Sequence, residues 1–316
     1  MGRVVVLGAS LGDMNLRLDR LPRPGETRLG SGFFRANGGK GANQAVAAAR
    51  LDAEVVLLSG FGDDESGRSM LDGYRREGLD LDHIRVEPGQ ASGVALILVG
   101  DDGENLIGVA MGPNAHLDPA YVDALPDSVF DGPGVFLASL EVPLETVIRA
   151  IERAKLGGMT VVLNPAPAPS NLAGHPILAK VDVLTPNQSE AAILAELDSD
   201  LDLDPNRVAD ALLARGARGV ALTLGASGCL VAFGSGRTFV AAFPARVVDT
   251  VGAGDAFNAA LAVALAEGSP LVDAARRGCA AASIAVTRPG ARGALPTRGE
   301  VDRVLAESSR SSRAED

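Results

Sequence analysis

Six short runs of apolar, mostly β-branched residues constrain the fold of this 316-residue chain more than any other feature. Strands that are exposed on one face alternate polar and apolar residues, whereas strands that are buried on both faces do not. Stretches with helical patterns separate most of these runs, for example 40–50 and 144–156. This alternation predicts an α/β fold, with a doubly wound and mostly parallel sheet flanked by helices. The six runs are 4–7, 55–59, 135–138, 160–163, 181–184 and 220–224.

Two segments, 26–35 and 92–110, break this rhythm because they combine strand composition with glycine and aspartate turn signals, without helices between them. They predict a small antiparallel β sheet that serves as a lid over the carboxyl ends of the main strands, where open α/β folds bind ligands. We therefore expect a single domain over residues 1–307 that includes the lid. Residues 308–316 are rich in serine, arginine and acid, and they predict a disordered tail.

Composition excludes several classes of function. The net charge of −11 and the pI of about 4.8 argue against a nucleic-acid partner, which would require clustered basic residues. Cys229 and Cys279 form neither a disulfide framework nor a metal-ligand spacing. The acidic run at 198–204 lacks the glycine and glutamate of a calcium loop and predicts a solvated loop. With no signal peptide and no long apolar segment, we expect a cytoplasmic protein without a membrane partner.

The segment from Asp249 to Phe257 reads DTVGAGDAF and leads into the apolar helical run 258–266. Glycines that open a helix leave free amides at its positive end, which form a cradle for a phosphoryl group. Asp255 lies beside this cradle, where a carboxylate can take a proton from a hydroxyl group. The alternative is that Asp255 only caps the helix.

A second glycine-rich turn, GGKGANQ at 38–44, opens an alanine-rich helix. Asn43 is placed to face whatever lies above the first turn, and a polyol is a suitable ligand there. The chain has no GxxxxGK[ST] motif, so Lys40 is not the lysine of a P-loop. The alternative is a flexible turn with a solvated lysine.

Together these two signatures resemble those of the ribokinase-like (PfkB-type) carbohydrate kinases, and the resemblance extends over nearly the whole chain. It is closer to the ribokinase branch than to other branches of the family. It implies an ATP-dependent phosphotransferase that acts on a sugar hydroxyl group. Further similar stretches are Pro24-Gly25-Glu26-Thr27, Gly62-Asp63-Asp64, Ser92-Gly93-Val94-Ala95, Gly103-Glu104-Asn105, Asn164-Pro165-Ala166-Pro167, Thr185-Pro186-Asn187 and Ala285-Val286-Thr287-Arg288.

The resemblance also implies roles for individual residues. Asp255 would be the catalytic base, and the amides of Gly252, Ala253 and Gly254 would bind the migrating phosphoryl group. Glu141 falls where the family contacts its sugar, although an ordinary acid at a helix entry is the alternative. The implied sugar-binding positions are Leu11, Asp13, Gly39, Lys40, Gly41, Asn43, Glu141 and Asp255.

On the nucleotide side, Asn187 and Glu190 match the family's N-x-x-E element, which holds magnesium near the phosphates; a helix cap and a surface acid are the alternative. The remaining positions that match the ATP site are Thr223, Gly225, Ser227, Gly228, Gly254 and Cys279. Potassium held by backbone carbonyls is a further implied activator. Its implied positions are Asp249, Val251, Ala285, Arg288, Gly290 and Ala294, of which Ala294 offers no hydroxyl group.

The match departs from the ribokinase pattern at Leu11, where an asparagine often precedes the sugar-binding aspartate by two residues. A sugar hydroxyl that is buried without a partner costs about 1–3 kcal/mol. The sequence therefore keeps 2-deoxyribose open beside ribose as the substrate. Cys279 also replaces a histidine that often lines the adenine pocket.

Three classes of function are compatible with the sequence. The first is a pentose kinase that converts D-ribose to D-ribose 5-phosphate. The second is a nucleoside kinase or another sugar kinase of the same fold, although only 3% of the residues are aromatic. The third, a non-catalytic sugar-binding protein, is disfavoured because both signatures are intact. Unpaired lid strands offer an edge for association, so we also expect a homodimer through the lid.

Overall fold

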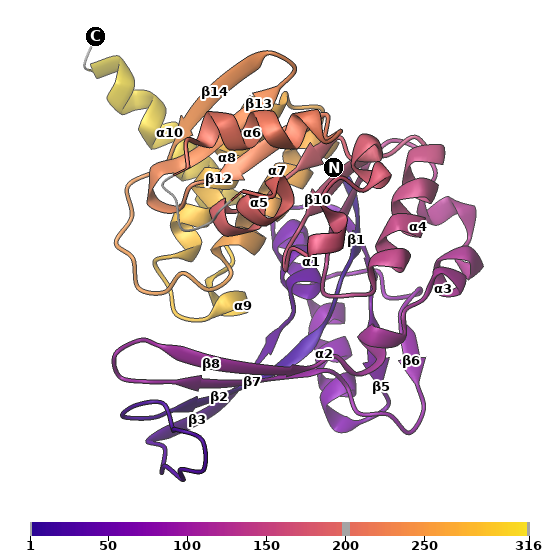
Figure 1. Ribbon diagram of the computed structural model, residues 1–316, viewed down its shortest axis with the longest axis vertical. Coiled ribbons are helices and arrows are strands. Elements are labelled where there is room, and N and C mark those ends of the chain that lie inside the picture. The colour runs from indigo at the N-terminus through magenta and orange to yellow at the C-terminus, as the bar shows by residue number, and fades with distance from the viewer. Residues whose placement is uncertain (1, 198–202, 315–316) are drawn as a thin grey trace.

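The computed structural model describes residues 2–197 and 203–314, and its centre is an eight-stranded sheet with the order β14-β13-β12-β11-β10-β9-β1-β4 (Figure 1). The strands from β4 to β12 pair in parallel, which confirms the predicted α/β class. An antiparallel hairpin at the β14 edge was not predicted. The strands are β1 (Arg3–Leu7), β4 (Glu54–Leu58), β9 (Val135–Ser139), β10 (Thr160–Asn164), β11 (Val183–Leu184), β12 (Gly219–Thr223), β13 (Gly228–Phe233) and β14 (Gly236–Ala241).

The apolar strands are explained by two separate hydrophobic clusters, one on each face of the sheet. Val4 and Val6 of β1 belong to the first cluster, whereas Val5 and Leu7 belong to the second. All four side chains are fully buried. Because both faces of the strand are covered, neither set of alternate positions tolerates a polar residue, and the sequence shows no alternation.

Helices cover both faces of this sheet. The first cluster is packed by α1 (Lys40–Arg50), α2 (Glu65–Arg76), α7 (Ala253–Ala266), α8 (Leu271–Ala285), α9 (Ala291–Ala294) and α10 (Arg298–Ala314). The second is packed by α3 (Pro119–Ala124), α4 (Leu144–Leu156), α5 (Gln188–Ala195) and α6 (Pro205–Ala214). Short elements complete the chain: β5 (Gly60–Gly62), β6 (Arg85–Glu87), η1 (Gly112–His116), η2 (Asp127–Val129), η3 (Ser170–Leu172), η4 (Pro176–Lys180) and η5 (Gly225–Ser227).

The lid is a four-stranded sheet with the order β3-β2-β7-β8, and it extends to one side of the molecule (Figure 1). It consists of β2 (Leu11–Arg17), β3 (Gly32–Gly38), β7 (Val94–Val99) and β8 (Asn105–Ala110). The predicted antiparallel sheet needs correction, because β2 pairs with β7 in parallel and β2 itself was not predicted. Since β1 ends at Leu7 and β2 begins at Leu11, the lid grows directly from the carboxyl edge of the main sheet.

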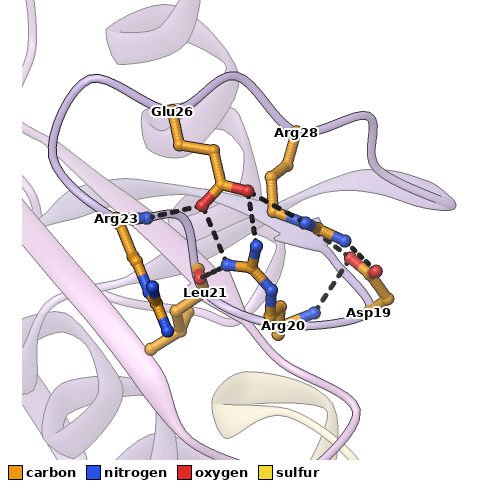
Figure 2. Close-up of polar contacts among 6 residues, drawn as sticks. All are labelled: Asp19, Arg20, Leu21, Arg23, Glu26 and Arg28. Atoms are coloured by element: carbon orange, nitrogen blue, oxygen red, sulfur yellow. Dashed lines mark hydrogen bonds and ion pairs between the residues drawn. The ribbon is translucent and has the colours of Figure 1, made fainter.

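The predicted strand at 26–35 is wrong in its first half, and a charged loop is the reason. Figure 2 shows Glu26 between Arg20 and Arg28, with Oε1 2.5 Å from Arg20 Nη2 and 3.0 Å from Arg28 Nη1. Glu26 also accepts from the amide of Arg23, and Arg28 pairs with Asp19. These contacts lower the pKa of Glu26 to about 2 and hold the segment in a loop, so that β3 begins only at Gly32.

In the tail that was predicted to be disordered, residues 308–314 continue α10, whereas residues 315–316 lie outside the described residues. Its first turns are anchored by Val301, which is buried, and by the partly buried Val304 and Leu305, so the polar end continues an established helix. Most of the predicted acidic loop, 198–202, also lies outside the described part of the chain. Within 2–197 and 203–314, no helix combines the length and apolar character that a bilayer crossing requires.

Replacing Glu26 by glutamine should loosen the loop between β2 and β3, because both arginines lose their shared carboxylate. We expect trypsin to cleave after Arg20 and Arg28 roughly threefold faster or more, since local opening governs cleavage of folded protein. Glu104→Gln in the β7–β8 turn serves as the control and should leave these rates unchanged. Equal rates in wild type and Glu26→Gln would show that the ion pairs do not order the loop.

Candidate active site

The GGKG turn places the start of α1 directly against the end of β1. A side chain at Gly41 would put its Cβ 2.4 Å from the carbonyl carbon of Gly8, so only glycine permits this approach. The amide of Ala42 donates to the carbonyl of Ala9 at 3.1 Å. Lys40 and Asn43 are thereby placed at the carboxyl edge of the sheet.

A second glycine turn starts α7 at the same edge. Gly252 is the N-cap with φ 80°, and a Cβ there would lie 2.9 Å from Cα of Ala291. The amide of Ala253 donates to the Thr250 carbonyl at 3.3 Å, and α7 begins at Ala253. The first amides of an α-helix have no acceptors within the helix, so this end is suited to an anion.

The two glycine turns meet at Asp255, a residue that is only 7% exposed. Its Oδ2 accepts from Asn43 Nδ2 at 3.0 Å, and its Oδ1 accepts from Gln44 Nε2 at 3.1 Å. Burial raises the pKa of Asp255, while the charge of Lys40 and the two amide hydrogen bonds act in the opposite direction. Sequence reasoning missed Gln44, although the residue stands in the quoted motif beside Asn43.

Lys40 lies among several carboxylates. Burial alone would lower the pKa of Lys40, but Asp255, Glu141 and Glu190 outweigh it and raise the pKa above its usual value. The backbone amide of Lys40 also donates to Glu141 Oε2 at 2.6 Å. Lys40 therefore keeps its positive charge among the carboxylates of Asp255, Glu141 and Glu190.

Two acids of this cluster have strongly raised pKa values. Burial raises the pKa of Glu141 to about 7, against the opposing charge and amide of Lys40. Burial likewise raises the pKa of Asp13 to about 6, with the Arg292 charge lowering it and Asp255 raising it. Asp13 stands on β2 opposite Ala36 of β3, at the base of the lid. Perturbed acids that gather at the carboxyl edge of a sheet indicate a functional site.

Arg292 is a charged member of the site that the sequence reading missed. Its guanidinium carbon lies 4.6 Å from the centroid of the Tyr74 ring, and its Nη2 donates to the Tyr74 hydroxyl at 3.0 Å. The carbonyl of Arg292 accepts from Arg50 Nη1 at 3.0 Å. No sequence signal marks this position, because its proximity to Asp13 depends on how α9 packs on the lid strand β3.

The predicted nucleotide residues lie at the ends of β11 and β12. Asn187 and Glu190 form a capping box at the start of α5, in which each side chain accepts from the other residue's amide at 2.9 Å. The amide of Thr223 donates to the Pro186 carbonyl at 3.0 Å, which brings the two strand ends together. The turn of Gly225 and Ser227 closes where the Leu224 amide donates to the Gly228 carbonyl at 2.8 Å.

The two loops that contain the predicted potassium positions, 249–251 and 285–294, are joined through the carboxylate of Asp249. Asp249 Oδ1 accepts from the amide of Val251 at 3.0 Å, and Asp249 Oδ2 accepts from the amide of Gly290 at 2.8 Å. Ala285 accepts from the amide of Arg288, and Ala294 is fully buried. Across the described ranges, no three His, Cys, Asp or Glu side chains are grouped so as to hold a metal ion.

Two predicted contact residues are deeply buried. Leu11 is 4% exposed, packs against Gly93 and belongs to the second hydrophobic cluster. Cys279 of α8 is 6% exposed, and burial raises the pKa of its thiol to about 12. The pKa of the neighbouring Cys229 is raised for the same reason, so neither thiol is a nucleophile at neutral pH.

Comparison with known families decides the class of this site. The model of the pfkB family of carbohydrate kinases matches residues 1–298. The chain belongs to this family. It is therefore a phosphotransferase with a sugar hydroxyl group as acceptor, as the sequence signatures predicted.

Three curated relatives match this chain over almost the whole length of both proteins. The ribokinase of Haemophilus influenzae is 37% identical over 297 residues, which cover 94% of this chain and 96% of that protein. The ribokinase of Schizosaccharomyces pombe is 38% identical over 312 residues, covering 96% and 97%. A deoxyribokinase of Salmonella typhi is 32% identical over 303 residues, covering 96% and 98%.

Solved structures agree with the fold of this kinase. The ribokinase of Thermotoga maritima matches with a TM-score of 0.86 at 30% identity, covering 97% of this chain and 100% of that chain. The ribokinase of Arabidopsis thaliana, solved in complex with ribose and ATP, matches with a TM-score of 0.84 at 28% identity, covering 96% and 98%.

The acids of the site whose pKa values are raised make the stability of the free protein depend on pH. The pKa of Glu141 is about 7 in the folded protein against 4.5 for an ordinary glutamate, so folded protein binds this proton more tightly. The stabilisation is therefore complete below pH 4.5 and is lost as the pH rises through 7. We expect unfolding by urea at pH 5 and 8 to show a smaller pH dependence in Glu141→Gln.

The exposed Glu145 at the start of α4 provides the matched control, because Glu145→Gln removes a carboxylate that is already in water. That variant should keep the pH dependence of the wild type. An unchanged dependence in Glu141→Gln would mean that this carboxyl is not desolvated.

Proposed function

We propose that the chain is an ATP-dependent pentose kinase that converts D-ribose to D-ribose 5-phosphate. The observation that carries the proposal is the buried carboxylate of Asp255. It lies at the amino end of α7 and is held by Asn43 and Gln44 of α1. A base and an anion-binding helix end are thus adjacent, which is the arrangement that phosphoryl transfer to a hydroxyl group requires.

In the proposed mechanism Asp255 accepts the proton of the sugar's primary hydroxyl as its oxygen attacks the γ-phosphorus. The bond from that phosphorus to the β,γ-bridging oxygen breaks, and ADP leaves. The amides of Gly252, Ala253 and Gly254 stabilise the charge that spreads over the transferred phosphoryl oxygens. Proton acceptance by a positioned base typically contributes about 10²–10⁴-fold to the rate.

The sugar hydroxyls are assigned to the first turn of α1 and to the acids around it. Asn43 Oδ1 is buried and has no hydrogen-bond partner within the described part of the chain, so it is an acceptor that a sugar hydroxyl group can use. Asp13 and Glu141 add carboxylates, and the positive charges of Arg292 and Lys40 act on Asp13 and Glu141 respectively. The backbone of Gly39 and Gly41 completes the proposed sugar site.

ATP is assigned to the ends of β11 and β12 through Thr223, Gly225, Ser227 and Gly228, with Gly254 at the phosphates and Cys279 beside the adenine. Asn187 and Glu190 offer oxygen donors, which suit magnesium. The capping box uses only one oxygen of the Glu190 carboxylate, so these residues fit the ion. When bound, magnesium supplies countercharge to the nucleotide phosphates.

A monovalent cation such as potassium is assigned to the two loops that Asp249 joins. The proposed ligands are the carbonyls of Val251, Ala285, Arg288 and Gly290, with Ala294 in the same segment, because carbonyl oxygens suit potassium. The close contact between Gly252 and Ala291 connects this region to the start of α7. A bound cation would there support the geometry of the anion-binding turn.

A second candidate substrate is 2-deoxyribose. Leu11 offers no hydrogen bond to a sugar hydroxyl, and the relative from Salmonella typhi is named a deoxyribokinase. A hydroxyl that faces an apolar side chain lacks compensation, whereas its absence in 2-deoxyribose costs nothing. Both sugars carry the primary hydroxyl group that the proposed base needs.

The function is tested by ADP release with ATP, magnesium and potassium on ribose, 2-deoxyribose, fructose and adenosine. We expect the highest kcat/KM with ribose or 2-deoxyribose. Asp255→Asn should lower kcat by about 10²-fold or more, because the base is lost, while sugar binding by calorimetry persists. Asp273→Asn on the surface of α8 is the control. Near wild-type turnover of Asp255→Asn would refute the assignment of Asp255 as the base. A preference for adenosine would refute the proposal that a pentose is the substrate.

We further propose that two copies associate through the lid, in the cytoplasm where ATP is available. Leu96 of β7 is central in the lid sheet yet 53% exposed, and Phe33 and Leu106 on the flanking strands are 58% and 56% exposed. Register places Leu96 on the same face as Met14 and Gly108, opposite to the face of Asp13. An apolar sheet face of this kind favours burial against a second copy.

Leu96→Asp should therefore convert a dimer into a monomer, because a charge in the middle of a buried apolar face is costly. Light scattering coupled to gel filtration measures the mass directly. Leu156→Asp is the control, since Leu156 is 85% exposed at the end of α4. A wild-type monomer, or a Leu96→Asp dimer, would contradict association through this face.

A further inference from the structure

A closed ring of hydrogen bonds links Asp255 back to its own helix. Gln44 Nε2 donates to Asp255 Oδ1 at 3.1 Å and to Asn164 Oδ1 at 3.0 Å. Asn164 Nδ2 donates to the Thr185 carbonyl at 3.1 Å. Thr185 Oγ1 donates to Asn258 Oδ1 at 2.5 Å, and Asn258 Nδ2 donates to the carbonyl of Gly254 at 2.8 Å. The ring therefore begins and ends in the first turns of α7.

The orientation of each group in the ring follows from its neighbour. An ionised carboxylate only accepts hydrogen bonds, so Gln44 must turn its NH₂ group toward Asp255. The second hydrogen of that group then goes to the carbonyl oxygen of Asn164, which fixes the Asn164 amide. The Gly254 carbonyl fixes Asn258 in the same way at the other end. No amide in the ring is free to rotate by half a turn without losing a bond.

The side chains of the ring lie in the interior of the protein. Exposed fractions are 0% for Gln44, 6% for Asn164, 1% for Thr185 and 2% for Asn258. Gln44 Oε1 is buried and finds no hydrogen-bond partner among the described residues, so this side chain is kept at a cost in stability. A buried polar network of this kind fixes one arrangement of its side chains.

We propose that Gln44 is a positioning residue for phosphoryl transfer: it holds the inner oxygen of Asp255, so that Oδ2 faces the sugar. The ring behind it ties the first turns of α7 to the ends of β10 and β11. This inference rests on the proposed function, in which Asp255 is the base. Gln44 touches neither substrate and acts only through Asp255.

The charged groups around Asp255 determine which readout separates positioning from folding. Lys40 on α1 favours the ionised carboxylate, whereas Asp13 on β2, Glu141 after β9 and Glu190 on α5 oppose it. Gln44 is a neutral donor to the ionised form. Its loss should raise the pKa of Asp255 and move the acid limb of the kcat profile to higher pH.

The test uses Gln44→Met, which keeps an unbranched side chain of similar size and removes both donors. We expect kcat to fall roughly 10- to 100-fold, KM for the sugar to change by less than about threefold, and the acid limb to move upward. Thr185→Val breaks the ring between Thr185 and Asn258 and should lower kcat about threefold to tenfold. Ser139→Ala removes a buried hydroxyl for which residues 2–197 and 203–314 provide no hydrogen-bond partner, and it should leave kcat unchanged.

The outcomes separate this inference from the proposed function. If Asp255→Asn keeps its turnover, the base assignment fails. If Asp255→Asn loses turnover while Gln44→Met keeps kcat and the acid limb of the wild type, the positioning role is wrong and the base stands. A fall in kcat that merely follows the fraction of folded enzyme, with an unmoved limb, also overturns it. If Gln44→Met does not fold, wild-type kcat in folded Thr185→Val overturns the proposal.

Discussion

The buried carboxylate of Asp255 at the amino end of α7 is the interaction on which the rest of the site depends. A carboxylate that is removed from water is costly, and here the helix end, the nearby Lys40 and the amides of Asn43 and Gln44 offset that cost. Each compensating group except the helix end comes from α1. The packing of α1 beside α7 is therefore as necessary to the proposed chemistry as the carboxylate itself.

The fold supplies this packing through two close approaches of backbone. Gly41 lets α1 approach Gly8 at the end of β1, and Gly252 lets α7 start against Ala291. Parallel strands end at one edge, so both helices begin where the lid also leaves the sheet. The same edge collects acids with raised pKa values, and the lid strand β2 carries one of them, Asp13. Sugar binding and phosphoryl transfer are thereby assigned to one connected region.

Local patterns were sufficient to predict much of this structure. The helix expected at 40–50 begins and ends as predicted, because its glycine turn and alanine-rich face are local signals. The lid strand β2 was missed because Gly12, Asp13 and Asn15 are poor strand formers, and its pairing with β7 depends on residues that are distant in sequence. Gln44 and Arg292 were missed for a related reason. Their partners Asp255 and Tyr74 come from other elements, and only tertiary packing brings them together.

A crystal structure with ribose and a non-hydrolysable ATP analogue will show whether Asp255 faces the acceptor hydroxyl group. The distance to measure joins the primary hydroxyl oxygen of the sugar to Asp255 Oδ2. We expect a hydrogen bond of about 2.6–3.2 Å, with the γ-phosphoryl group at the start of α7. A sugar whose primary hydroxyl faces Glu141 or solvent, with Asp255 bound only to Asn43 and Gln44, would contradict it.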